Sequence, residues 1–208
     1  MKKYLSLFLS FSLLFTIAAC SREEPLSELE SIQKQLAEME GYTCTATLTR
    51  TNERGEQTYE TKQYCKSTGE YRLELTAPEN VAGNYTVFDG ERICQYNPRL
   101  DSSIIRDIPE SQHRNELFLN QFIQNYMQSE GVSVETAALD ESRCIVLEAI
   151  IPGNDAALAS EKLWVDRESL LPVRFVIYDA EGEERYSMDY SSFEFDPQFD
   201  DALFTIEE

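Results

Sequence analysis

The stretch Tyr42-Thr43-Cys44-Thr45-Ala46-Thr47-Leu48-Thr49 decides the fold class, because two kinds of side chain alternate along it. Tyrosine, cysteine, alanine and leucine occupy the even positions, and threonine occupies every odd one. Successive side chains of a β-strand point to opposite faces, so a period of two predicts a strand with one buried face and one wet face. A strand of this kind is typical of antiparallel sheets.

A second strand is predicted over residues 58–65, and a tight turn centred on Arg54-Gly55 would join it to the first as a hairpin. That turn sets a register in which Cys44 lies opposite Cys65. Directly opposed residues have Cα atoms about 4.5 to 5.5 Å apart, which is within the range of a disulfide. We therefore predict a Cys44–Cys65 bridge, which depends wholly on this register.

Further short strands follow, separated by turn residues. The strongest hairpin signal is Asp89-Gly90, because this pair suits the positive φ angles of a tight turn between strands 84–88 and 91–96. The other predicted strands span residues 71–75, 104–108, 132–138, 143–151, 159–166, 171–179 and 184–195. About ten antiparallel strands result, and a twisted sheet of that size tends to curl into an open half-barrel.

Two segments have the longer period of an amphipathic helix. In the first, apolar residues recur every three or four positions before Gly41: Leu26, Leu29, Ile32, Leu36 and Met39. The second, between Ser111 and Glu130, has the apolar rows Phe118, Phe122, Tyr126 and Leu119, Ile123, Met127, opposite Asn120, Gln121, Gln124, Asn125 and Gln128. The predicted fold is α+β: a strongly curved antiparallel sheet with two helices on its concave face.

The amino terminus has the pattern of a bacterial lipoprotein export signal. Two lysines precede an apolar run that ends in Ile17-Ala18-Ala19-Cys20. A retained transmembrane helix is the alternative, but the run is shorter than the roughly 20 residues such a helix needs. We expect residues 1–19 to be a signal peptide, residues 20–25 a tether lipidated at Cys20, and residues 26–208 a single domain.

Lipidation would attach the protein to the outer face of the cell membrane. Each buried CH₂ of an acyl chain contributes about 0.8 kcal/mol of membrane affinity. The tether before the first predicted helix is short. The domain, and anything that it binds, should therefore lie beside the membrane.

The chain is strongly acidic, with 18 Lys+Arg against 38 Asp+Glu and a formal charge of -20. Removal of Lys2 and Lys3 with the signal leaves 16 against 38, or -22. Such a domain is repelled by nucleic acid and by anionic lipid headgroups. It would attract a protein with a basic surface.

Five cysteines make an even set once Cys20 is assigned to the lipid. Cys44, Cys65, Cys94 and Cys144 remain, in a compartment where disulfides persist. If the first two are bridged, Cys94 and Cys144 are left as the second candidate pair. The wide spacing lacks the Cys-x-x-Cys pattern of a zinc site, so we expect no metal there.

Catalytic signatures are weak. His113 is the one histidine, and its neighbours supply no acid, nucleophile or metal partner at fixed spacing, so we interpret it as an exposed helix-cap residue. Asp196, Asp200 and Asp201 near Glu194 suggest a calcium site, but they lack the EF-hand spacing, which favours a solvated acidic edge. We predict no enzyme and no cofactor.

Several short motifs resemble those of the LolA/LolB-like lipoprotein superfamily. They are Tyr71-Arg72-Leu73-Glu74, Asp89-Gly90-Glu91, Tyr96-Asn97-Pro98, Leu163-Trp164-Val165-Asp166, Leu171-Pro172-Val173-Arg174-Phe175, Asp179-Ala180-Glu181-Gly182, Tyr190-Ser191-Ser192-Phe193 and Asp201-Ala202-Leu203-Phe204. Within that superfamily, Gly41-Tyr42-Thr43-Cys44 and Gln63-Tyr64-Cys65-Lys66-Ser67 are similar to the germination lipoprotein GerS-like family. The resemblance spans nearly all of the mature chain.

This resemblance implies a half-barrel with an apolar cavity between its helices and its sheet. It also implies a non-catalytic lipoprotein that binds and activates a cell-wall or spore-cortex amidase during germination. A carrier or receiver of lipoprotein acyl chains is the alternative, with an acyl chain as ligand. A structural envelope lipoprotein is the third. Function does not follow from such a fold alone.

Overall fold

The computed structural model describes residues 27–109, 115–129, 133–139, 142–153 and 155–207. These residues form one sheet, two α-helices and a short 3-10 helix. The elements in chain order are α1 (Glu28–Glu38), β1 (Gly41–Asn52), β2 (Gly55–Lys66), β3 (Tyr71–Ala77), β4 (Tyr85–Phe88), β5 (Arg92–Asn97), β6 (Ser102–Asp107), α2 (Leu119–Gln128), β7 (Ser133–Leu139), β8 (Ser142–Ile150), β9 (Ser160–Asp166), β10 (Pro172–Tyr178), β11 (Glu184–Phe195) and η2 (Asp201–Phe204).

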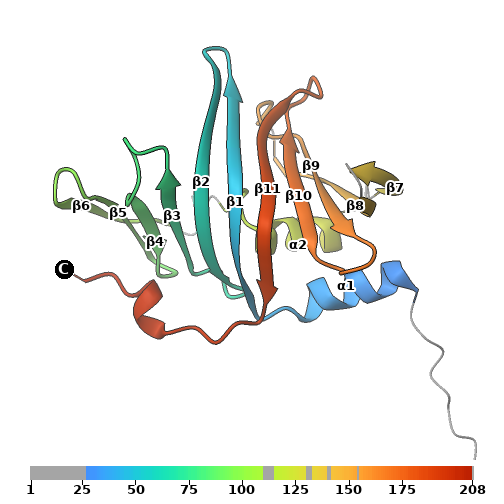
Figure 1. Cartoon of the computed structure of the whole chain (residues 1–208), viewed down its shortest axis with the longest axis horizontal. Coiled ribbons are helices and arrows are strands. Elements are labelled where there is room, and N and C mark those ends of the chain that lie inside the picture. The colour runs from blue at the N-terminus through green and yellow to red at the C-terminus, as the bar shows by residue number, and fades with distance from the viewer. Residues whose placement is uncertain (1–26, 110–114, 130–132, 140–141, 154, 208) are drawn as a thin grey trace, which may run out of the picture.

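The sheet is 11-stranded and antiparallel, with the order β6-β5-β4-β3-β2-β1-β11-β10-β9-β8-β7. The first strand, β1, therefore lies in the middle of the sheet, and the following strands are added one by one up to the β6 edge. It then passes through α2 to the opposite edge at β7 and returns to the middle, where β11 pairs with β1. Figure 1 shows this open, curved sheet with α2 behind the central strands. The predicted fold class is confirmed.

Both helices pack on the same face of the sheet and share one apolar core. From the helices come Ile32, Leu36, Leu119, Phe122 and Tyr126, all buried. The strands contribute the inward positions of their alternating patterns, among them Tyr42, Cys44, Ala46, Leu147, Leu163, Val165, Phe175, Ile177 and Met188. Each fully buried large apolar side chain contributes about 1.5 to 3 kcal/mol. This shared core holds the helices in the concavity.

The predicted register of the β1–β2 hairpin is wrong by two residues. Asn52 pairs with Gly55, so the two turn residues are Glu53 and Arg54 rather than Arg54 and Gly55. The Asn52 side chain stabilises this turn, because its Oδ1 accepts a hydrogen bond of 2.8 Å from the Arg54 N–H. Gly55 then begins β2 with a φ of 107°, which glycine adopts without strain.

The shifted register separates the first pair of cysteines. Cys44 lies opposite Gln63, and Cys65 lies opposite Tyr42, so the two cysteines share a face but are diagonal neighbours. Diagonal residues across a sheet are about 7 to 8 Å apart, beyond ordinary disulfide reach. In the structure both thiols are free and buried.

The second predicted bridge is also corrected. Cys94 belongs to β5 and Cys144 to β8, and the strands from β4 to β9 lie between them in the sheet order. Neighbouring strands are about 4.8 Å apart, so the two residues are far beyond disulfide distance. Both are free thiols.

Candidate functional site: a polar cleft beside helix α2

Helix α2 lacks a side-chain cap of its own and is anchored to the sheet instead. Its N-cap residue, Phe118, makes no side-chain capping hydrogen bond. The hydroxyl of Tyr42 on β1 accepts a hydrogen bond of 3.3 Å from the Leu119 N–H and donates one of 3.3 Å to Gln63 Oε1. Complete burial raises the pKa of Tyr42 well above its ordinary value, so the hydroxyl keeps its proton.

The other end of α2 is anchored by a buried acid. Asn125 donates a hydrogen bond of 2.8 Å to Glu161 Oε1 on β9, and the Glu161 side chain is 0% exposed. Burial raises the pKa of Glu161 to about 7, and the charge of Glu116 acts in the same direction, whereas the Asn125 hydrogen bond opposes the shift. Glu161 Oε2 has no hydrogen-bond partner among the described residues. The core thus contains a carboxyl group that titrates near neutral pH.

A hydrogen bond connects this buried pair to the surface. Gln121 Nε2 donates to Asn125 Oδ1 over 3.1 Å. Gln121 is partly exposed and lines a cleft next to α2. The polar network therefore runs from the cleft to the interior of the protein.

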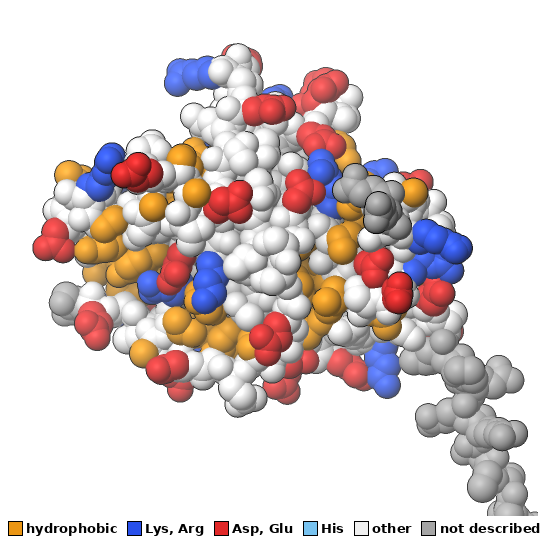
Figure 2. Space-filling model, viewed as in Figure 1, with side chains coloured by type: hydrophobic (Ala, Val, Ile, Leu, Met, Phe, Trp, Pro, Cys, Tyr) orange, Lys and Arg blue, Asp and Glu red, His pale blue; other side chains and the backbone are white. Residues whose placement is uncertain are grey.

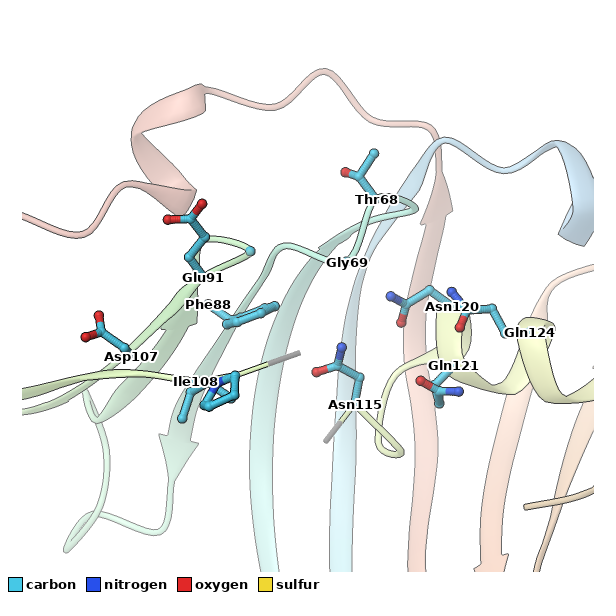
Figure 3. Close-up of a pocket in the computed structure, with 12 residues that line it drawn as sticks. Thr68, Gly69, Phe88, Glu91, Asp107, Ile108, Asn115, Asn120, Gln121 and Gln124 are labelled. Carbon is cyan, nitrogen blue, oxygen red and sulfur yellow. The ribbon is translucent and has the colours of Figure 1, made fainter. Parts of the chain in front are cut away.

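The cleft lies between α2 and the nearby ends of strands β2 to β6. Its volume is about 840 Å³, which is within the range of small-ligand sites. Figure 3 shows that its walls come from the β2–β3 turn, the β4–β5 turn, the end of β6 and the amino-terminal half of α2. The described lining residues are Thr68, Gly69, Phe88, Gly90, Glu91, Asp107, Ile108, Pro109, Asn115, Asn120, Gln121 and Gln124.

Carboxamides dominate the helix side of the cleft. Asn120, Gln121 and Gln124 belong to α2, and Asn115 precedes it. The carboxylates of Glu91 and Asp107 stand at the far side and point away from the amide wall in Figure 3. No lysine, arginine or histidine occurs among the described lining residues. The amides of this wall can both donate and accept hydrogen bonds, which suits a ligand rich in polar groups.

One of these amides is buried without a partner. Asn120 is 7% exposed, and its Oδ1 accepts no hydrogen bond from any described residue. Figure 3 shows its side chain extending from α2 toward the cleft. A buried unsatisfied acceptor costs about 1 to 3 kcal/mol, so a ligand with a suitable N–H or O–H would recover that energy.

Aromatic side chains connect the α2 region to the sheet. The ring of Phe118 stacks on Tyr71 with centroids 4.1 Å apart. The ring of Phe122 contacts Phe175 edge-on at 5.7 Å. Aromatic rings of α2 and of its N-cap residue therefore pack the helix against the sheet.

Among the described residues, those singled out in the sequence do not assemble into a site. Cys20 and His113 lie outside the described residues. Asp196 Oδ1 accepts hydrogen bonds from the N–H groups of Glu40 and Gly41, and Asp200 Oδ1 accepts one from Ala202. These carboxylates cap backbone groups. Within the described part of the chain, no three metal-ligating side chains gather, and no helix is long and apolar enough to cross a membrane.

Comparison of the whole sequence with protein families identifies a match. Residues 1–204 fit the model described as sporulation protein YdcC-like. The chain belongs to this family. No curated protein matches the chain in sequence.

Several solved structures are similar to this member of the family. An uncharacterized conserved protein from Thermus thermophilus is 15% identical, with 88% of this chain and 96% of that chain covered and a TM-score of 0.54. A chain from the structure of the CwlD amidase of Clostridioides difficile in complex with the GerS lipoprotein is 26% identical, with 83% of this chain and 98% of that chain covered and a TM-score of 0.49. A LolA superfamily protein from Nitrosomonas europaea is 16% identical, with 88% of this chain and 99% of that chain covered and a TM-score of 0.43.

Proposed function

We propose that this protein is a membrane-anchored, extracytoplasmic regulator that binds a cell-wall or spore-cortex amidase and activates it without catalysing a reaction itself. Membership of a sporulation family supports this setting. So does the resemblance of Gly41-Tyr42-Thr43-Cys44 and its partner-strand motif to germination lipoproteins.

The observation that carries the proposal is the acidic excess of the chain. Its formal charge is -20, and Figure 2 shows Asp and Glu side chains spread over one face of the sheet and around its rim. An acidic surface of this kind attracts a protein with a basic surface and repels anionic lipid. A protein partner with a basic face therefore suits the domain.

The anchor is the second part of the proposal. Cys20 would carry the acyl chains, residues 20–25 would form the tether, and α1 begins soon afterwards at Glu28. Replacement of Cys20 by serine should release the protein from the membrane fraction. The same replacement at Cys94, a free and buried thiol of β5, is the matched control and should leave the protein in that fraction.

Co-purification from native membranes tests the amidase partner. We expect an amidase to be recovered with the protein, and its activity to rise when the protein is added back. Association should weaken with salt, because exposed charges are screened beyond about 10 Å at 0.1 M ionic strength. The proposal is wrong if no amidase is recovered and amidase activity does not respond.

An acyl-chain receiver is the second candidate, because a groove lined in part by apolar side chains lies open on the surface of the sheet. Its volume is about 380 Å³, and Leu73, Leu75 and Ile104 line it together with Leu100, which is 73% exposed. Mass spectrometry of the protein purified from membranes distinguishes the candidates. A stoichiometric lipid in addition to the anchor would support the receiver, and its loss in Ile104→Asn would locate the lipid.

A further inference from the structure

We propose that the polar cleft beside α2 binds a sugar chain that carries acetamido groups, as the glycan strands of a cell wall do. Sugar binding at this cleft is a separate activity from amidase binding, and it does not require that an amidase binds. Its setting outside the cytoplasm rests on the proposed anchor at Cys20.

The first argument is the chemistry of the wall. Asn115, Asn120, Gln121 and Gln124 each present both a donor and an acceptor, which matches the mixed hydroxyl and acetamido groups of such a sugar. The cleft volume of about 840 Å³ accommodates several sugar rings.

The second argument is the buried Asn120 acceptor. Its Oδ1 has no hydrogen-bond partner among the described residues, and Asn120 is only 7% exposed. An acetamido N–H or a sugar hydroxyl would supply the missing donor. A buried acceptor of this kind discriminates strongly against ligands that lack the donor.

The third argument is preorganisation. Gln121 is held by its hydrogen bond to Asn125, which is itself held by Glu161. With its Nε2 engaged inward, the Gln121 Oε1 is available to the cleft. A wall that is already ordered loses less conformational entropy when a ligand binds.

A pair of sugars with the same linkage tests the proposal on the full-length protein in detergent. The probe is the β-1,4-linked tetramer of N-acetylglucosamine, and the control is cellotetraose, which lacks the acetamido groups. Titration by calorimetry or ligand-detected NMR should show binding of the first and at least about tenfold weaker binding of the second. Equal affinity for both sugars, or no binding of the tetramer, would overturn the proposal.

Matched variants place the site. Gln124→Ala removes an exposed amide of the cleft, and Gln128→Ala removes an exposed amide one turn further along α2, outside the cleft. The first should weaken tetramer binding about threefold to tenfold, the value of one hydrogen bond, and the second should leave it unchanged. Asn120→Leu should weaken it further. Equal effects of the two glutamine variants would exclude this cleft.

A basic peptide is the competing occupant. If oligolysine bound in a manner that Gln124→Ala weakens, while the sugar tetramer did not bind, the cleft would be a protein-docking site. That result would refute the glycan proposal. It would leave amidase binding to be judged by co-purification.

Discussion

The two helices of this protein occupy the same concave face but are specified in different ways. Helix α1 begins with a complete capping box, in which the Glu30 N–H donates to Ser27 Oγ and the Ser27 N–H donates to Glu30 Oε2. Helix α2 has no such cap, and its ends are bonded to Tyr42 and Glu161 on the sheet. The amino-terminal cap of α1 is therefore encoded within a few residues, whereas the corresponding contact of α2 requires a strand distant in sequence.

Because of this difference, α2 is better suited than α1 to connect the cleft with the core. Polar contacts with the sheet connect it to β1 and β9. One of these contacts titrates near neutral pH. A change at the cleft can therefore reach the core through α2. Helix α1 makes a partly buried hydrogen bond of 2.9 Å from Gln33 Nε2 to the Tyr126 hydroxyl and an exposed one between Glu28 and Arg167.

The largest expected effect comes from the core side of α2. Phe122→Ala should lower the free energy of unfolding by about 3 to 5 kcal/mol, because the 0% exposed ring leaves a cavity against Phe175. Met127→Ala is the control, since this side chain is 49% exposed, and it should cost less than about 1 kcal/mol. Urea denaturation followed by circular dichroism measures both. Similar losses would show that α2 is not held by its buried face.

The buried acid should make stability depend on pH. The pKa of Glu161 is raised from 4.5 to about 7, so the protonated carboxyl stabilises the fold. This contribution to the free energy of unfolding is complete below about pH 4.5 and is lost as pH rises through about 7. The loss is on the order of 3 kcal/mol at full ionisation. Glu161→Gln should abolish this decline.

Denaturation midpoints between pH 4 and pH 9 measure the effect. Glu38→Gln, on the exposed side of α1, serves as the control and should retain the decline of the original protein. A Glu161→Gln profile that falls as steeply as that of the original protein would contradict this role for Glu161.

The hydroxyl of Tyr42 should matter next. Tyr42→Phe keeps the ring but leaves the Leu119 N–H and Gln63 Oε1 unpaired, which should cost about 1 to 3 kcal/mol. Hydrogen exchange of the Leu119 amide should accelerate in the variant. Tyr96→Phe removes only an exposed hydroxyl that bonds to Asp101, and it should have little effect. Unchanged exchange at Leu119 would mean that Tyr42 does not anchor α2.

The smallest expected effect is at the cap of α1. Ser27→Ala removes the capping acceptor and should cost about 1 kcal/mol. Ser31→Ala, inside the helix, should be close to neutral. If the capping loss equalled that of Tyr42→Phe, the two helices would depend on their amino-terminal bonds to the same extent.

Periodicity predicted most elements but not the hairpin register. The alternation of β1 and β2 places Cys44 and Cys65 on the buried face in either of two registers that differ by two residues, so it cannot choose between them. The choice came from the turn, where the Asn52 side chain supports Glu53-Arg54. A local side-chain contact therefore decided whether the cysteines were opposed.

The candidate cleft was only partly visible in the sequence. The periodicity of α2 places a polar row opposite its apolar rows, and the structure shows that Asn120 and Asn125 of this row are buried. Glu161 had a signal of its own, because strand alternation puts it on the same face as Leu163 and Val165. That a carboxyl on this face meets Asn125 depends on how α2 crosses the sheet.

The sequence by itself determined the alternating strands, the two amphipathic helices and the acidic charge, because each is a property of residues close together along the chain. Tertiary structure decided the sheet order, the separation of Cys94 from Cys144 and the contact of Asn125 with Glu161. Those features depend on the passage of the chain from the β6 edge through α2 to the β7 edge. Local periodicity cannot specify that passage, because it records which face a residue occupies but not what lies opposite.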